Sequence, residues 1–196
     1  MNPLGEVMSS SIVGFVAEAW SDVEVPLPGF GGFVKACSPE HGFDIIGVVF
    51  DVITGPQDSQ HKPTALKMTR EQLKLRQPHI FSLLKTDLHV AVCAHKRGSS
   101  LLCRLPPYPP SVHDFVEPLS KAELAQMGDN LEFLSLLVRV SAVPQDELIS
   151  SCLANIAAAR SDEYDFLVGA GRQLAQLYRE DYDALTAVLN KIRPLK

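Results

Sequence analysis

The residues best suited to chemistry lie on one predicted β-hairpin. His89, Cys93 and His95 fall on its first strand, and Cys103 falls on the strand that returns after a turn at 96–100. Alternate residues of a strand share a face, so the first three are expected to point the same way, with Cys103 near them. Two imidazoles and two thiolates would satisfy the tetrahedral coordination of zinc. The hairpin is therefore a candidate metal site.

Other observations favour a structural role for this hairpin. Its spacing matches no established zinc motif, and the strands of a barrel also carry His and Cys for packing. A Cys-His nucleophilic pair would need a third, orienting group and an oxyanion hole, and the sequence indicates neither. We therefore assign no catalytic residue, no metal and no cofactor. A small metalloprotein or enzyme using His89, Cys93, His95 and Cys103 is kept as an alternative hypothesis.

A glycine-containing segment, Gly169-Ala170-Gly171-Arg172, superficially resembles part of a phosphate-binding loop. It lacks the order of the P-loop and the lysine that reaches the phosphates, and it lies inside a helical pattern. We interpret it as small residues that let two helices approach closely.

One segment of the chain, residues 56–87, contains a cluster of positive charge. A short helix is predicted there, with Thr69 as its N-cap and Gln72 in the capping-box position. Five of the segment's basic residues form the cluster: Lys62, Lys67, Arg70, Lys74 and Arg76. A solvated helix face is the ordinary interpretation, and a docking surface for an acidic partner or nucleic acid is the sharper one. The candidate partner-binding residues are Lys67, Arg70, Lys74 and Arg76.

The elements that must position these residues begin with a strand at 43–54, the most apolar and β-branched run of the chain. Short strands at intervals of about ten residues, with glycines at their ends, predict a small closed β-barrel. Gly47 stands where a barrel strand must coil or where another backbone approaches. The barrel is expected to span 1–107, interrupted by a helical insertion at 56–87.

A proline-rich segment, residues 106–110, predicts a domain boundary. Four prolines in five residues cannot join a ladder or a helix interior. Residues 108–196 then show helical periodicity. Ser120 is predicted to cap a helix in a capping box with Glu123, Asp129 and Ser161 are predicted to cap two others, and one more is predicted to start at Pro144. The predicted fold class is α+β: an N-terminal barrel with a helical insertion, followed by an acidic α-helical bundle.

The net charge of -5 is unevenly distributed. Residues 1–107 carry ten Lys/Arg and ten Asp/Glu, whereas residues 108–196 carry eight and thirteen. An acidic second half repels phosphate backbones, so bulk charge argues against nucleic-acid binding except through the basic insertion.

The compartment is inferred from the cysteines and the first residues. Four cysteines without CxxC spacing, and an N-terminus without the features of a secretory signal, predict a cytoplasmic protein with free thiols. The most apolar run is too short to cross a bilayer as a helix and contains Asp44 and Asp51, so no membrane insertion is expected.

Three short segments resemble a known barrel family: Gly5-Glu6-Val7, Gly32-Phe33-Val34-Lys35 and the strand Ile46–Val52. The pattern is similar to the HAS barrel, which HerA-type DNA translocases and F-type ATP synthase subunits share, and covers about the first 107 residues. In those families an ATPase core follows the barrel, and this chain shows no such core. The resemblance therefore implies a subunit-contact module and does not carry over the motor activity.

Two functional hypotheses of different classes follow. The first is a non-enzymatic adaptor or assembly factor that acts through protein contacts of its barrel and helical domain, with a ring ATPase subunit or a homo-oligomer among the expected partners. The second is a DNA-processing accessory protein that binds nucleic acid or a translocase through the basic insertion.

Overall fold

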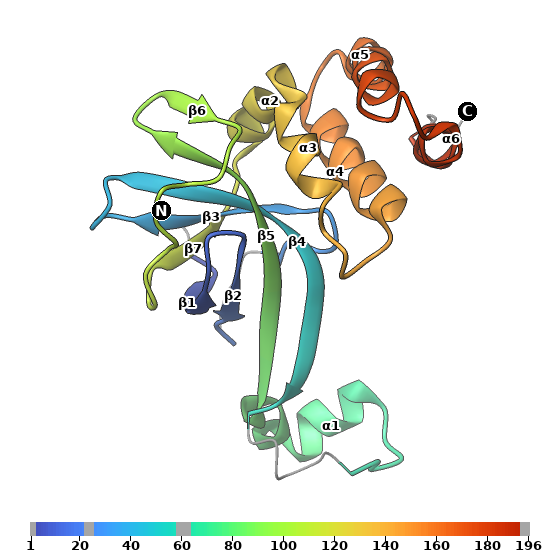
Figure 1. Ribbon diagram of the computed structural model, residues 1–196. Helices are drawn as coiled ribbons and strands as arrows, with labels where there is room; N and C mark the ends of the chain where they lie inside the picture. Colours follow the sequence, from blue (N-terminus) through green and yellow to red (C-terminus); the bar gives the residue numbers. More distant parts are fainter. Residues whose placement is uncertain (1–2, 22–25, 58–63, 193–196) are drawn as a thin grey trace.

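The computed structural model describes residues 3–21, 26–57 and 64–192. Its strands are β1 Gly5–Ser10, β2 Gly14–Ala19, β3 Phe33–Ser38, β4 Phe43–Pro56, β5 Leu84–Arg97, β6 Ser100–Leu102 and β7 Phe115–Pro118. They form one sheet in the order β2-β1-β7-β3-β4-β5-β6, and an additional pairing of β2 with β5 closes it. The result is a six-stranded barrel with β6 as a short appendage of β5 (Figure 1). The predicted α+β class, with an N-terminal barrel followed by helices, is confirmed.

Strand β7 was not expected from the sequence, yet it completes the barrel. It pairs antiparallel with β1 on one side and β3 on the other, with Gly5 opposite Val116 and Lys35 opposite Glu117. The proline-rich segment at 106–110 therefore connects two strands of the same sheet. The division into domains at residue 107 stays a prediction.

The interior of the barrel is an apolar cluster in which residues of every barrel strand take part. Its buried residues are Leu4, Val7, Phe15, Ala17, Val34, Ala36, Phe43, Ile45, Val49, Leu88, Val90, Val92 and Val116. Gly47 faces this interior, where a Cβ would lie 2.7 Å from the Ala91 carbonyl oxygen. The predicted close approach of another backbone at Gly47 is thus confirmed, and a side chain there would force two paired strands apart.

The helices that follow β7 are α2 Lys121–Asp129, the 3-10 turn η2 Leu131–Phe133, α3 Leu134–Leu137, α4 Gln145–Ala159, α5 Glu163–Leu177 and α6 Tyr182–Lys191. Ser120 forms the predicted capping box with Glu123, and α4 begins directly after Pro144. Two predicted caps are wrong. Asn130, and not Asp129, accepts the capping hydrogen bond at η2, because Asp129 is the last residue of α2. At α5 the N-cap is Asp162, and Ser161 precedes it.

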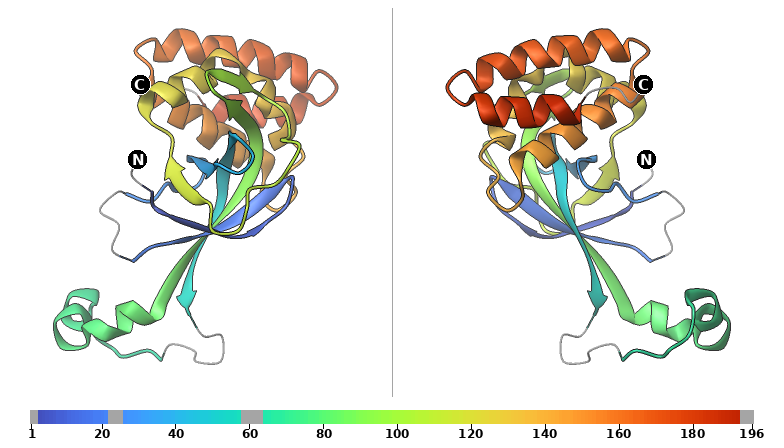
Figure 2. Two further views of the ribbon diagram at one scale, coloured as in Figure 1. Left: turned by 90° about the vertical axis from the view of Figure 1, so that its left-hand side faces the viewer. Right: turned by 90° about the vertical axis from the view of Figure 1, so that its right-hand side faces the viewer.

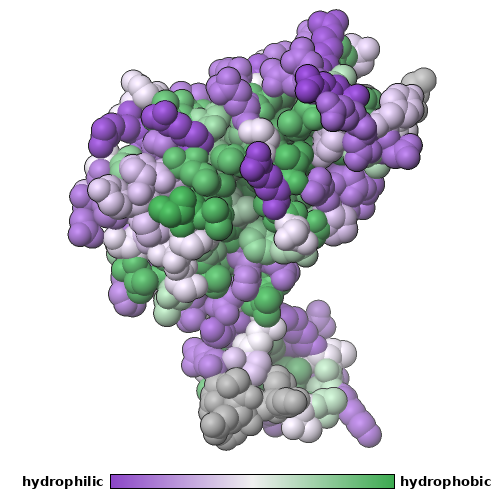
Figure 3. Space-filling model, in the orientation of Figure 1, coloured by the Kyte–Doolittle hydropathy of each residue, from purple (hydrophilic) through white to green (hydrophobic). Residues whose placement is uncertain are grey.

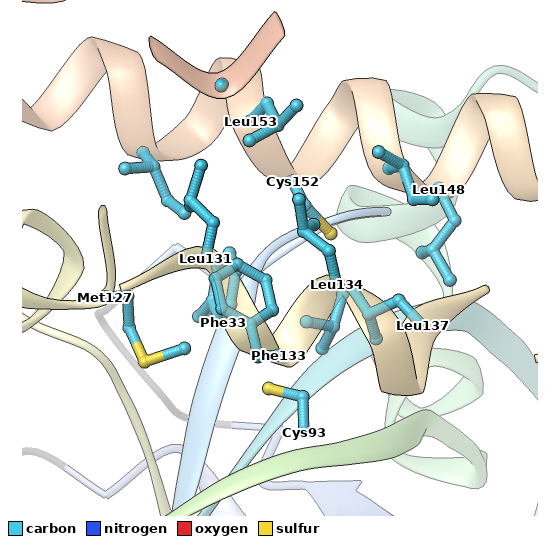
Figure 4. Close-up of a cluster of buried hydrophobic side chains, with 14 of the residues drawn as sticks. Phe33, Cys93, Met127, Leu131, Phe133, Leu134, Leu137, Leu148, Cys152 and Leu153 are labelled. Atoms are coloured by element: carbon cyan, nitrogen blue, oxygen red, sulfur yellow. The ribbon is translucent and has the colours of Figure 1, made fainter. Parts of the chain in front are cut away.

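The helices cover one side of the barrel and share a second core with it (Figures 1 and 2). Outward-facing strand residues such as Phe33, Val48 and Cys93 pack in this core with residues such as Phe133 and Cys152 of the helical region. Figure 4 shows Cys93 on its strand beneath Phe133, with the α4 side chains above. Barrel and helices are therefore joined by apolar burial, the dominant favourable contribution to folding.

One helical interpretation from the sequence is also wrong. A Cβ on Gly169 would meet nothing within 4 Å, and one on Gly171 would make only ordinary contact, 3.5 Å from Leu189 Cδ2. The two glycines do not mark a close helix crossing. The close approach occurs at Gly128 of α2, where a Cβ would lie 2.8 Å from Ile156 Cγ2.

In the described ranges, no helix combines the length and the apolar character needed to cross a bilayer.

Candidate functional site

The side chains of the predicted hairpin site do not come together, because β5 contains a β-bulge. Ala94 pairs with Ile46 and Val92 pairs with Gly47, so Cys93 is an extra residue on its strand. A bulge shifts the alternation of faces by one residue. Cys93 consequently packs outside the barrel under the helices, whereas His95 packs against Phe43 at 5.6 Å between ring centroids. The expectation that His89, Cys93 and His95 share a face is therefore wrong.

The four side chains have separate surroundings. His89 is half-buried beside Phe50, and Cys103 Sγ lies 3.6 Å from the Asn130 carbonyl oxygen. Burial raises the pKa of the Cys93 thiol well above its ordinary value, which disfavours the thiolate that metals require. Among the residues with described positions, no group of three or more His, Cys, Asp or Glu side chains is arranged to hold a metal ion.

The basic segment has a clearer geometry. The outer ends of β4 and β5 continue beyond the barrel as a two-stranded ribbon that carries α1 Arg70–Arg76 and the 3-10 turn η1 Pro78–Leu83. We call residues 52–57 and 64–85 the arm. Figures 1 and 2 show it projecting on the side away from the helices, and Figure 3 shows it as a separate lobe.

The arm is built from local signals that the sequence contains. Thr69 caps α1, its side chain accepting from the Gln72 backbone N–H while the Gln72 side chain accepts from the Thr69 backbone N–H. The predicted capping box is confirmed. Pro78 then begins η1, and the Arg70 guanidinium lies over the Phe81 ring at 5.2 Å. These contacts stabilise the arm within itself and leave its outer surface free.

The four candidate partner-binding residues, Lys67, Arg70, Lys74 and Arg76, are all exposed on the arm. The fifth basic residue of the sequence cluster, Lys62, lies outside the described residues. Within 64–85 the only acidic residue is Glu71, against these four basic residues and Lys85. The arm thus presents a concentrated positive surface on a chain of net negative charge.

Apolar side chains accompany that charge, and their exposure was not expected. No residue of α1 is buried, Leu75 is 85% exposed and Leu83 is 59% exposed. A signal was available, because Leu73 and Leu75 are two residues apart and cannot share a face of a helix with 3.6 residues per turn. Only one of them can pack, and the structure half-buries Leu73. Leu75 is left exposed, between Lys74 and Arg76 in the sequence and one helical turn after Glu71.

A hollow of opposite charge lies at the far side of the molecule, in the helical region. It has a volume of about 830 Å³ between the end of α4, the start of α5 and the end of α6. Its apolar lining includes Ala154, Ala157 and Ile192, and its charged lining consists of Asp162, Glu163, Asp165 and Lys191. This hollow therefore has an excess of acidic residues in its lining, whereas the arm has an excess of basic ones.

Fold and site together define a small closed-barrel protein with a projecting basic arm that exposes Leu75 and Leu83. Neither the models of known protein families nor the curated protein sequences contain a match to this chain.

Proposed function

We propose that this chain is a non-enzymatic adaptor whose arm docks on an acidic surface of a partner protein. The observation that carries the proposal is the position of α1. It is held away from the body on a two-stranded ribbon, buries none of its residues, and exposes Leu75 on the same arm as Lys67, Arg70, Lys74 and Arg76.

Magnitudes support a binding role for this arrangement. Burying one leucine side chain in a partner contributes about 1.5–3 kcal/mol. Basic residues around such an anchor contribute mainly orientation and association rate, which electrostatic complementarity controls. An exposed leucine on a basic arm therefore fits an acidic surface with an apolar depression.

We also propose that the barrel is of the HAS type and makes a subunit contact. The closed six-stranded barrel supports this, as do the strands that begin at Gly5 and Phe33. A ring ATPase subunit is then one candidate partner, and the cytoplasm is the expected compartment. The second contact of the adaptor would be the acidic helical region.

The same arm supports a second candidate function, binding of nucleic acid, through its positive charge. Phosphate contacts by Lys and Arg are independent of Leu75, whereas docking on a protein needs it. Substituting Leu75 thus separates the two functions.

The decisive experiment places a photo-crosslinking amino acid at position 75 of the full chain, in a nuclease-treated lysate of the native host. We expect one predominant adduct, mapped by mass spectrometry to an acidic segment of another protein. Crosslinking should be lost in a variant with Lys67, Arg70, Lys74 and Arg76 changed to Gln. The matched control changes four exposed basic residues of the helical region, Lys121, Arg139, Arg172 and Arg179, to Gln and should leave the adduct intact.

The alternative outcomes are distinct. An adduct only with a second copy, mapped to Asp162 to Asp165, would replace the adaptor with self-assembly through the helical hollow. Salt-sensitive binding of the arm to a DNA duplex, unaffected by Leu75→Gln, would favour the nucleic-acid function. Equal crosslinking by the two four-residue variants would refute the proposal.

A further inference from the structure

A second pocket lies at the end of the barrel opposite the arm. Its volume is about 420 Å³, and its lining residues are Phe43, His95, Arg97, Leu102, Arg104, Leu105 and Pro107. β4 begins at Phe43 and reaches the arm at Pro56, whereas β5 leaves the arm at Leu84 and ends at Arg97. Pocket and arm are therefore at opposite ends of the same two strands.

The register of the β5–β6 hairpin places its polar residues together. His95 pairs with Leu102 and Arg97 pairs with Ser100. Because alternate residues of a strand share a face, His95 and Arg97 lie on one face with Leu102. Arg104 follows two residues after Leu102 and completes the lining. The pocket is thus a consequence of the bulge at Cys93, which places His95 on this face.

The electrostatics of the lining are one-sided. Two guanidiniums line the pocket, and no Asp or Glu does. Arg97 and Arg104 form no salt bridge with another residue of the described ranges. A guanidinium presents five N–H donors in a planar fork that matches phosphate and carboxylate oxygens. The pocket is therefore suited to an anion.

A buried imidazole contributes a further polar atom. The His95 side chain is only 6% exposed, and its Nδ1 lies 3.1 Å from the Arg104 carbonyl oxygen. A carbonyl oxygen only accepts, so Nδ1 carries the proton in this hydrogen bond. Nε2 has no hydrogen-bond partner among the described residues. In this tautomer Nε2 is an acceptor, so it can meet a hydroxyl or amino donor of a ligand but not a phosphate oxygen.

Aromatic rings form a row beside this lining. Tyr108 stacks on His41 at 5.1 Å, His41 on Phe43 at 5.7 Å, and Phe43 lies against His95 at 5.6 Å, each distance between ring centroids. Phe43, Leu102 and Leu105 give the pocket apolar walls. Pockets for small molecules commonly have volumes of about 300–1,000 Å³ and combine apolar walls with a few convergent polar groups.

We propose that this pocket binds a phosphate monoester of a small aromatic compound, of the size of a nucleoside monophosphate. Two guanidiniums without a lining carboxylate match a group of nearly two negative charges, which a phosphate monoester carries near neutral pH. A carboxylate carries only one. The flat ring of the ligand packs against Phe43 and the leucines, while the phosphate meets Arg97 and Arg104. The site is independent of the arm, so either proposal can fail alone.

Isothermal titration calorimetry with the full chain tests the site, using adenosine monophosphate, adenosine, inorganic phosphate and benzoate as probes. We expect saturable binding of adenosine monophosphate, weaker binding of phosphate, and none of adenosine or benzoate. Arg97→Gln and Arg104→Gln should each lower the affinity for adenosine monophosphate by about tenfold or more, because hydrogen bonds to charged groups contribute about 1.5–3 kcal/mol. Arg172→Gln, an exposed substitution on α5, is the matched control and should change nothing.

A second measurement locates the ligand. The ring resonances of His95, followed by NMR, should shift on addition of the monophosphate in the wild-type chain and remain unchanged in Arg104→Gln at the same concentration. Binding that survives both arginine substitutions, or that shifts His79 on the arm and not His95, would overturn the proposal. Stronger binding of benzoate than of phosphate would replace the phosphate monoester with a carboxylate and equally contradict it. No saturable binding of a phosphorylated probe up to about 1 mM would dismiss the site.

Discussion

Lys35 of β3 donates a hydrogen bond from its Nζ to Glu123 of α2, with 2.8 Å between Nζ and Oε1. Lys35 is half-buried on the outer face of the barrel, and Glu123 is the capping-box residue of α2. One carboxylate therefore caps a helix and connects that helix to the barrel. Lys96 of β5 approaches the same oxygen at 3.8 Å.

This pair predicts a loss of stability in acid. Burial alone would raise the pKa of Glu123, but the hydrogen bonds from Lys35 and Ser120 outweigh it and lower the pKa from 4.5 to about 2. A lowered folded-state pKa stabilises the protein above pH 4.5, and this contribution is lost as the pH falls toward 2. We expect Glu123→Gln to destabilise the protein at pH 7 and to have a much smaller effect near pH 2. Urea unfolding at several pH values measures both.

A double-mutant cycle identifies the partner. In a Lys35→Met background, Glu123→Gln should lower the free energy of unfolding at pH 7 by less than it does in the wild type. Equal costs in the two backgrounds would show that Lys35 does not stabilise the carboxylate.

A second prediction concerns Gly31, where adding a side chain should lower the stability of the protein. It has a φ of +75°, and a Cβ there would lie 2.5 Å from the Ser151 Cβ of α4 and 2.8 Å from its carbonyl carbon. Gly31→Ala should destabilise the protein by roughly 2–4 kcal/mol, because backbone strain and overpacking add. Gly42 also has a positive φ, +67°, with nothing near its missing Cβ, so Gly42→Ala measures the backbone effect alone. Equal unfolding free energies for the two variants would rule out the packing contribution.

The hydrogen bonds of Arg160 are expected to stabilise the helical region. Its Nε and one terminal nitrogen donate to the two carboxylate oxygens of Asp162 at 2.8 and 2.9 Å, and the other donates to Asp129 and to the Ala125 carbonyl oxygen. Arg160→Lys keeps the charge but cannot form this fork, so the free energy of unfolding should fall by about 1–3 kcal/mol. Arg179→Lys, whose exposed side chain pairs with Glu180 at 3.4 Å, should have almost no effect. Thermal unfolding compares them.

In the arm, one substitution should weaken binding of the partner without lowering the stability of the protein. Leu75 has almost no packing to lose, so Leu75→Gln should leave the melting temperature nearly unchanged while weakening capture of the partner. Leu73→Gln, on the half-buried face of the same helix, serves as the contrast and should loosen the arm, which amide hydrogen exchange across 70–83 detects. Unchanged partner capture by Leu75→Gln would exclude this side chain as the anchor.

Much of the fold could be predicted from local signals. Apolar strands with glycines at their ends predicted β1 to β5, and the capping boxes at Thr69 and Ser120 predicted two helix starts. The basic helix was found because charge and a capping box coincide within one short segment. In each case neighbouring residues determine the structure, and a pattern of a few residues is sufficient.

The parts that could not be predicted depend on distant pairings. β7 has four residues, and its partners in β1 and β3 are far away in the sequence. The bulge at Cys93 depends on the register between β4 and β5, which cannot be predicted from neighbouring residues. The bulge places His95 and Cys93 on different faces of the sheet. Arg97 and Arg104 meet in a pocket only because of that register.

The position of β7 has a consequence for how the chain folds. Loop closure between Gly5 and Val116 costs more entropy than closing the neighbouring hairpins, so this pairing is expected to form late. Until residues 115–118 arrive, β1 and β3 each present an unpaired edge, the kind of edge at which strands of separate molecules join. A chain still emerging from the ribosome would hold an open sheet until then. Pairing of β7 thus closes the barrel last. Variants that slow this pairing should aggregate or exchange strands even where the stability of the native state is unchanged.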